Sequence, residues 1–275
     1  MTVSDKLIIN AAITGCVLTK ADTSFLPVTL TEIVDCARRV QDAGASIVHL
    51  HARNPDQTPS FEAAAYQELV DSVRHACGDL IICVSLSGRH MQDVAKRAIA
   101  LDARPEMASL TLGSMNFPKE PSINSPDVIR ELAMRIYAGG AIPELEVFES
   151  GFINYADFLI KKEVLRPPYY INIILGSLGA APLSLTGLGN MLNMLPPGAT
   201  WSVGGIGQYQ LDANVMAIAS GGHVRVGIED NIYFDRRKTE LADNVRLVRR
   251  IAGIARELGR EPASSAEARR IIGLA

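Results

Sequence analysis

Eight short apolar runs, each followed by a stretch with helical spacing, constrain the fold of this chain more than any other feature. The runs are rich in β-branched residues and lie at 7–13, 46–52, 80–87, 107–113, 142–148, 169–175, 200–206 and 223–228. Apolar runs that alternate with helices in one continuous series are typical of parallel strands. An eightfold series within 275 residues is what an α/β fold of the (β/α)8 TIM barrel type requires, so we expect one barrel domain over 1–275.

The helical segments between these runs are marked by apolar spacing, capping residues and glycines. The first helix is expected to start at Thr29 or Thr31 and to end before Gly44. The closing helix is expected to be capped at Thr239 and to end before Gly259. Other helices are expected near 60–78, 93–103, 126–139, 153–164, 184–195 and 209–220.

A doubly wound open sheet is the main alternative fold. Such sheets usually carry a Gly-x-Gly-x-x-Gly turn after an early strand. The first turn of this chain, AAITGCVLTK, lacks that pattern, which favours the barrel.

Composition argues against two classes of partner. A net charge of −3 offers no basic surface for nucleic acid. Residues 167–211 contain no Asp, Glu, Lys or Arg, yet glycines and prolines keep the stretch from offering the ~20 continuous apolar residues of a membrane span. We interpret it as buried strands and Gly-rich loops with a large buried or subunit-contacting surface, and we expect a homo-oligomer.

The cysteines and the N-terminus indicate a cytoplasmic protein. Cys16, Cys36, Cys77 and Cys83 are scattered without Cys-x-x-Cys spacing, which is typical of reduced thiols rather than of a disulfide framework. The opening segment MTVSDKLIIN does not have the pattern of a signal peptide.

Two histidines one residue apart, His49 and His51, close the second apolar run in the sequence VHLHAR. Side chains two residues apart share one face of a strand, and the strand ends carry the functional residues of a barrel. Two imidazoles ~6–7 Å apart along a strand converge on one metal ion if a third ligand is added. A lone histidine here is more often a hydrogen-bonded core residue, but the paired spacing favours a metal.

The sequence GIEDN at the end of the eighth run supplies the candidate third ligand. Glu229 would complete a His₂Glu set with a position left for substrate, and Asp230 is placed to act as a general base. Asp230 also fits a plain turn before Asn231. An arginine inside a barrel strand is costly unless paired, so we expect Arg225 to bind a carboxylate or to orient Asp230.

Further polar residues fall at the ends of the third, fourth and fifth runs. Acids that face a barrel interior need a cation or a proton, which applies to Glu144 and Glu146. The other candidates for binding substrate are Ser85, Ser87, Arg89, Ser109, Thr111, Ser114 and Asn116.

Two Gly-rich loops follow the sixth and seventh runs. They are GSLGAAP and GGIG, with Gly176, Gly179, Gly204 and Gly205 as the candidate ligand-binding glycines. Backbone N–H groups in such loops often bind phosphate in barrel enzymes, although glycines of this kind also make tight turns.

In this order, the motifs HLHAR, MASLTLGSMNF, PELEVFE, GSLGAAP, VGGIG and GGHVRVGIEDNIY resemble those of the β-keto acid cleavage enzymes, whose best-known member is the 3-keto-5-aminohexanoate cleavage enzyme. The resemblance runs from about Ile8 to the last helix. It implies a zinc-dependent barrel, tetrameric and cytoplasmic, that converts a β-keto acid and acetyl-CoA into acetoacetate and a new acyl-CoA.

The resemblance also implies roles for individual residues. His49, His51 and Glu229 would bind Zn²⁺ or another divalent metal, Asp230 would be the base, and Arg225 would position it. Glu146, Ser87 and Thr111 would line the substrate site. Ser85 matches the family position assigned to Ser87 equally well. The Gly-rich loops would help to hold CoA.

One segment departs from the family pattern. Many members carry a Thr-Thr-Gly-Gly-like stretch after the third strand, whereas this chain has VSLSGRHMQD, with Arg89 and His90 where small residues are common. The added cation favours a substrate with an acidic tail.

Two other functions fit the same residues. One is a different metal-dependent carbon–carbon enzyme, such as an aldolase or acyl-CoA lyase, which would need no acetyl acceptor. The other is a ligand-binding barrel without activity.

Overall fold

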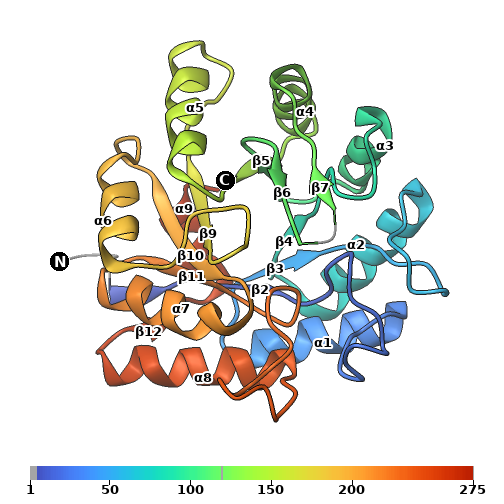
Figure 1. Cartoon of the computed structure of the whole chain (residues 1–275). Helices are drawn as coiled ribbons and strands as arrows, with labels where there is room; N and C mark the ends of the chain where they lie inside the picture. The colour runs from blue at the N-terminus through green and yellow to red at the C-terminus, as the bar shows by residue number, and fades with distance from the viewer. Residues whose placement is uncertain (1–4, 119, 275) are drawn as a thin grey trace.

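The computed structural model describes residues 5–118 and 120–274, and its centre is a closed parallel barrel. The barrel strands are β2 (Ile9–Ala12), β3 (Ile47–Leu50), β4 (Ile81–Val84), β5 (Met107–Thr111), β8 (Ile142–Val147), β9 (Tyr170–Leu175), β10 (Thr200–Gly205) and β11 (His223–Val226). Each strand pairs with the next, and β11 pairs with β2 to close the ring (Figure 1). The predicted (β/α)8 barrel is confirmed, and every one of its strands falls within an apolar run identified from the sequence.

Helices follow the strands and cover the outside of the barrel. They are α1 (Leu30–Asp42), α2 (Ala63–Cys77), α3 (Val94–Ala98) with a 3-10 turn at Ile99–Ala103, α4 (Pro126–Ala138), α5 (Ser150–Lys161), α6 (Leu185–Asn193), α7 (Gln210–Ala219) after a 3-10 turn at Gly207–Tyr209, and α8 (Asn244–Glu257). Thr29, one of the two predicted caps, accepts a hydrogen bond from the backbone N–H of Glu32, and the Glu32 carboxylate accepts one from Thr29 N–H. This reciprocal capping fixes where α1 begins.

The expected cap of the last long helix was wrong. Asp243, not Thr239, caps α8 by accepting from Arg246 N–H. Thr239 instead contacts Asp235 in the preceding loop. Leu241, which lies between the expected and the observed cap, forms an isolated β-bridge with Tyr233, and α8 starts after that bridge.

Short elements missing from the sequence prediction complete the fold. The strand β1 (Lys6–Leu7) pairs with β12 (Glu261–Pro262), and α9 (Ser265–Ile272) follows, so α8 does not close the chain. A hairpin of β6 (Met115–Asn116) and β7 (Pro121–Ser122) extends from the end of β5.

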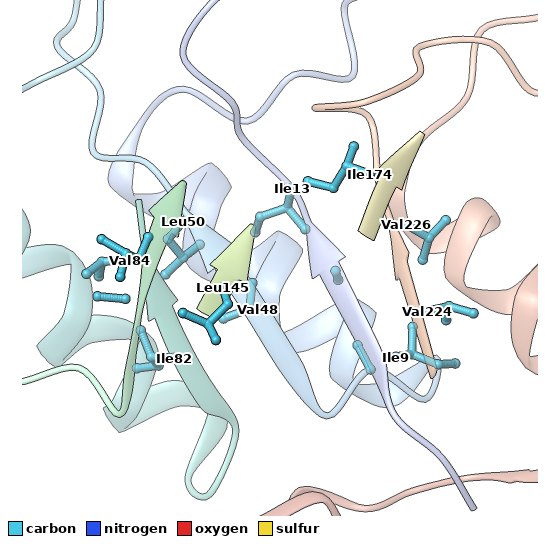
Figure 2. Packing of buried hydrophobic residues seen from close by; sticks show 14 of the residues in the cluster. Ile9, Ile13, Val48, Leu50, Ile82, Val84, Leu145, Ile174, Val224 and Val226 are labelled. Carbon is cyan, nitrogen blue, oxygen red and sulfur yellow. The ribbon is translucent and has the colours of Figure 1, made fainter. Parts of the chain in front are cut away.

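Alternating side chains along the strands divide the core into two parts. Outward-facing residues pack against the helices, and Figure 2 shows Ile9, Val48 and Ile82 among them, on three neighbouring strands. A separate apolar cluster consists of residues at the N-terminal ends of the strands together with α9, namely Ile8, Ile47, Ile81, Cys83, Met107, Tyr170, Ala263, Ala268 and Ile272. This cluster closes the lower end of the barrel and leaves the polar inward residues for the other end.

The uncharged stretch 167–211 folds into β9, α6, β10, the 3-10 turn before α7 and the first residues of α7, with the loops between them. Within 5–118 and 120–274, no helix has the length and apolar character needed to cross a membrane. Two leucines of the stretch lie on the surface, Leu178 with 84% of its area exposed and Leu185 with 79%.

Candidate active site and metal centre

A cavity of about 260 Å³ opens at the C-terminal end of the barrel. Residues at or after the C-terminal ends of all eight barrel strands contribute to its wall, as expected for a barrel whose strand ends converge there. The sequence-predicted residues that line it are His51, Ser85, Ser87, Arg89, Thr111, Glu146, Arg225, Glu229 and Asp230.

The three predicted metal ligands lie close together: His51 and Glu229 line the cavity, and His49 is buried next to them outside its lining. Glu229 Oε1 lies 3.3 Å from His51 Nε2 and 3.9 Å from His49 Nε2. Ligand atoms on one tetrahedral zinc ion, each 2.0–2.1 Å from the metal, lie roughly 3.3 Å apart. The donor set and its spacing therefore fit a divalent ion that binds both imidazoles and the carboxylate.

Backbone contacts hold these ligands in place. The other oxygen of Glu229, Oε2, accepts a hydrogen bond from Gly15 N–H at 3.1 Å. A Cβ atom at Gly15 would lie 3.0 Å from Glu229 Cγ, so the approach depends on the glycine. The N–H of His51 donates to Thr14 Oγ1 at 2.8 Å. The loop after β2 thus supports ligands from two other strands.

Arg225 joins the carboxylates beside the metal ligands. Its guanidinium is 2% exposed, and Nε donates to Asp230 Oδ2 at 2.8 Å while Nη2 donates to Glu229 Oε1 at 2.8 Å. Nη1 lies 3.6 Å from Glu146 Oε1 but has no hydrogen-bond partner among the described residues. Arg225 lines the cavity, but Nη1 itself has almost no solvent contact.

Burial and charge separate the pKa values of Glu229 and Asp230. Burial raises the pKa of Asp230, although Arg225 opposes the rise. Burial also acts upward on Glu229, but His51 and Arg225 outweigh it and hold the pKa of that carboxyl well below its ordinary range. This difference between the two pKa values suits a carboxylate at Glu229 that stays charged as a metal ligand, next to a carboxylate at Asp230 that accepts a proton.

Glu146 lies on the side of the cavity formed by β5 and β8. Its Oε2 accepts a hydrogen bond from Thr111 Oγ1 at 2.6 Å. Burial raises the pKa of Glu146, with Arg225 acting in the opposite direction. The pair can therefore offer substrate both a hydroxyl and a carboxyl group.

Arg89 lies near the mouth, over an aromatic ring from the β6–β7 hairpin. Its guanidinium carbon is 3.5 Å from the centre of the Phe117 ring. Within the described residues it has no ion-pair partner, whereas His90 Nδ1 lies 3.3 Å from Glu120. Phe117 and Glu120 also line the cavity and were not predicted, whereas the predicted Asn116 of the same hairpin lies outside the lining.

The remaining predicted residues lie outside this lining. Gly179 borders an adjacent cavity of about 560 Å³, where the carbonyl oxygen of Asn116 would lie 2.2 Å from a Cβ atom added to it. A Cβ at Gly204 would lie 3.2 Å from Arg225 Cβ, and one at Gly205 only 2.6 Å from the Tyr209 carbonyl oxygen. Gly176 has φ +84° and packs on the Tyr209 ring. Close packing accounts for all four glycines.

A buried polar network lies beneath the metal ligands. Glu144 is 0% exposed and contacts His49 Nδ1 at 2.8 Å. Burial opposes its charge, but His49 outweighs that effect and lowers the pKa of Glu144 to about 2. Asn10 and Asn172 donate to the same carboxylate. The sequence marked Glu144 as an inward acid, but single asparagines in apolar runs gave no sign of this contact.

Comparison with known proteins gives concordant results. The sequence model of a family described as beta-keto acid cleavage enzyme matches residues 6–274. A 3-keto-5-aminohexanoate cleavage enzyme of Fusobacterium nucleatum is 39% identical over 272 residues, which cover 98% of each chain. A 3-oxoadipate:acetyl-CoA acetyltransferase of Cupriavidus necator is 36% identical over 270 residues, 97% of this chain and 94% of that one.

Solved structures agree on the fold. The apo structure of ObcA superposes with a TM-score of 0.77 at 20% identity, covering 91% of this chain. The present chain spans 66% of the ObcA chain. At this identity the likeness concerns the barrel alone.

Proposed function

Because the chain belongs to the beta-keto acid cleavage enzyme family, we propose that it uses acetyl-CoA to cleave a β-keto acid. The products are acetoacetate and the CoA thioester of the remaining acyl group. The observation that carries this proposal is the metal-compatible set of His49, His51 and Glu229, with the Arg225-bound Asp230 beside it.

His49, His51 and Glu229 would hold the divalent ion. Once bound, the ion would supply a Lewis acid for the oxygens of the keto acid and for the negative charge of its enolate. Thr111 and Glu146 would contact the substrate from the opposite wall, with Ser85 or Ser87 beside them. Arg225 would position Asp230 through the hydrogen bonds that its Nε and Nη2 donate to that carboxylate.

The reaction needs one base and conserves every atom. Asp230 removes a proton from C2 of the keto acid, and C2 attacks the acetyl carbonyl of acetyl-CoA as the CoA thiolate leaves. The thiolate then attacks the original ketone, and the bond between C2 and C3 breaks. Asp230 returns the proton to C2 of acetoacetate, which leaves the acyl group on CoA.

CoA would lie beside the loop that follows β9. Ser177 of this loop lines the main cavity, and Gly179 lines the adjacent one. Gly176 supports the turn of the same loop, whereas Gly204 and Gly205 would act by leaving space for Arg225 and Tyr209. Asn116 would contribute from the hairpin between the two cavities.

A screen of β-keto acids tests this function. With acetyl-CoA present, we expect acetoacetate release that stops on chelation and returns with Zn²⁺. The variant His51→Ala should lose bound metal and activity together, whereas His75→Ala, an exposed histidine of α2, should keep both. Cleavage at an undiminished rate without acetyl-CoA would indicate a lyase and refute the proposal.

We propose that Arg89 favours substrates with an acidic tail. Its guanidinium borders the cavity without an ion-pair partner among the described residues, and Nε lacks a hydrogen-bond partner. We expect wild type to prefer β-keto dicarboxylates over neutral β-keto acids in kcat/KM. Arg89→Ala should lose that preference and Arg89→Lys should keep part of it. An unchanged preference in Arg89→Ala would exclude this role.

Four further features complete the proposal: the domain organisation, the identity of the metal, the oligomeric state and the location in the cell. The chain would act as a single catalytic domain over 1–275, with Zn²⁺ as the ion because two imidazoles and a carboxylate suit it. A homo-oligomer is supported by the exposed Leu178 and Leu185 in an uncharged surface. A cytoplasmic location is supported by four free thiols, Cys16, Cys36, Cys77 and Cys83.

A further inference from the structure

A carboxylate without solvent contact lies directly behind the metal ligands, and the reaction above does not use it. Glu144 Oε2 contacts His49 Nδ1 at 2.8 Å and accepts from Cys83 Sγ at 3.2 Å. Its Oε1 accepts from Asn10 Nδ2 at 2.6 Å and from Asn172 Nδ2 at 3.0 Å. A buried charge is costly unless it is fully paired, so simple packing does not explain a glutamate here.

The hydrogen bonds of Glu144 determine where His49 carries its proton. Three of the four contacts come from groups that donate to the carboxylate, so Glu144 is the acceptor at each. The fourth contact then requires a proton on His49 Nδ1. In the neutral ring, Nε2 is left with its lone pair, and Nε2 is the atom that lies 3.9 Å from Glu229 Oε1.

A second cation site formed by His49, Cys83 and Glu144 does not fit these distances. Two ligands of a tetrahedral zinc ion lie roughly 3.3 Å apart when both are N or O, and farther when one is S. Nδ1 and Oε2 are 2.8 Å apart, and Sγ and Oε2 are 3.2 Å apart. These distances are typical of hydrogen bonds and are too short for two ligands of one tetrahedral ion.

We propose that Glu144 is a positioning residue that holds His49 in its Nδ1–H tautomer and directs Nε2 toward the metal. The inference rests on the metal centre proposed above. Carboxylates that hold a histidine ligand from behind raise its basicity, and their loss typically weakens metal binding 10- to 100-fold.

The variant Glu144→Gln tests this role by reversing one hydrogen bond. Asn172 cannot turn its amide freely because its Oδ1 accepts from Ser202 Oγ at 2.9 Å. The new glutamine oxygen would therefore stay with Asn172, and its NH₂ group would face His49. Donation to Nδ1 would move the ring proton to Nε2, so we expect Zn²⁺ affinity to fall 10- to 100-fold in competition with a chromophoric chelator.

Glu146→Gln is the matched control. It makes the same change two residues along β8, at a carboxylate bonded to Thr111 rather than to a histidine. We expect it to lower activity and to keep Zn²⁺ affinity within about twofold of wild type. A folded Glu144→Gln protein with wild-type Zn²⁺ affinity would overturn the positioning role. If His51→Ala also kept wild-type affinity, the metal centre itself would be refuted.

A measurement on the wild-type protein covers the case in which Glu144→Gln does not fold. Long-range ¹H–¹⁵N spectra of histidine-labelled, zinc-free protein distinguish the two tautomers, and the His49→Ala variant assigns the signals. We expect a protonated Nδ1 and an unprotonated Nε2 at His49. A neutral His49 ring protonated on Nε2 would contradict the inference.

Discussion

The sequence predicted which polar residues lie at the C-terminal ends of the strands. It did not predict the buried residues that form hydrogen bonds with them. His51, Arg225, Glu229 and Asp230 meet around one cavity because parallel strands converge at their C-terminal ends. Asn10 gave no such signal, since one amide in an apolar run does not reveal which strand lies across the barrel. The ligand candidates were therefore predictable, but the support beneath them was not.

His223 shows how one buried side chain makes stability depend on pH. Its Nδ1 accepts a hydrogen bond from Ile8 N–H at 3.1 Å. Burial, assisted by the charge of Arg260, lowers the pKa of His223 to about 3. The unfolded chain takes up the proton near pH 6.5 and the folded chain does not. Stability from this group is thus constant above pH 6.5 and falls as the pH drops from there toward 3.

We predict that His223→Asn removes this pH dependence. Asparagine keeps an acceptor for Ile8 N–H but cannot be protonated in this range. Wild type should lose about 2 kcal/mol more unfolding free energy than the variant between pH 7 and pH 5. Urea titrations at both pH values measure the difference. Equal losses in the two proteins would show that His223 does not titrate on unfolding.

At the scale of elements, long segments followed the sequence pattern and short ones did not. The apolar spacing placed α1 and α4, and the structure shows Thr29, one of two predicted caps, and Ser125, which was not predicted, bonded to their own first turns. β1, β6, β7 and β12 have two residues each; β1 and β12 pair across most of the chain, and β6 and β7 pair with each other in a hairpin. Local pattern cannot specify elements of that kind.

The turn after β11 shows how close packing positions Glu229 and Asp230, the proposed metal ligand and base. Gly227 precedes Glu229 by two residues, and a Cβ added to it would lie 2.0 Å from the carbonyl oxygen of Ala12 in β2. Its own carbonyl accepts from Gln210 Nε2 at 2.8 Å. The turn is therefore held between β2 and α7.

We predict opposite effects for two glycine-to-alanine changes. Gly227→Ala should lower the unfolding free energy by about 1–3 kcal/mol, because the turn must move away from β2. The same movement should weaken Zn²⁺ retention. Gly253→Ala, on the exposed face of α8 with no atom near the added methyl, should raise stability by about 0.5–1 kcal/mol. Urea unfolding and metal analysis measure both; unaltered metal retention in folded Gly227→Ala would contradict the first.

For the whole molecule, an apolar cluster and the polar cavity lie at opposite ends of the barrel. The lower end is closed by apolar residues and by α9, with Ile272 2% exposed. The upper end holds the charged residues around the cavity. The strand count predicted the barrel and the polar residues at its C-terminal end. It did not predict that α9 closes the other end, because that closure depends on contacts between segments far apart in the sequence.

We predict that Ile272→Ala reduces stability without changing catalysis. Removing a buried isoleucine side chain should cost about 2–5 kcal/mol, while kcat and KM stay near wild type because the change lies far from the cavity. Arg270→Ala, an exposed neighbour on α9, should alter stability by less than about 0.5 kcal/mol. Chemical unfolding and steady-state kinetics test the separation, and a large loss of kcat in a folded Ile272→Ala protein would argue against it.

The pairing of β11 with β2 means that the ring of strands has no intrinsic first member. Spatial order around the barrel and order along the polypeptide are therefore separable properties. In a circularly permuted chain that begins at another strand, the same neighbours could re-form. The histidines of β3 and the acids that follow β11 would then meet at the same rim, although the sequence distance between them had changed.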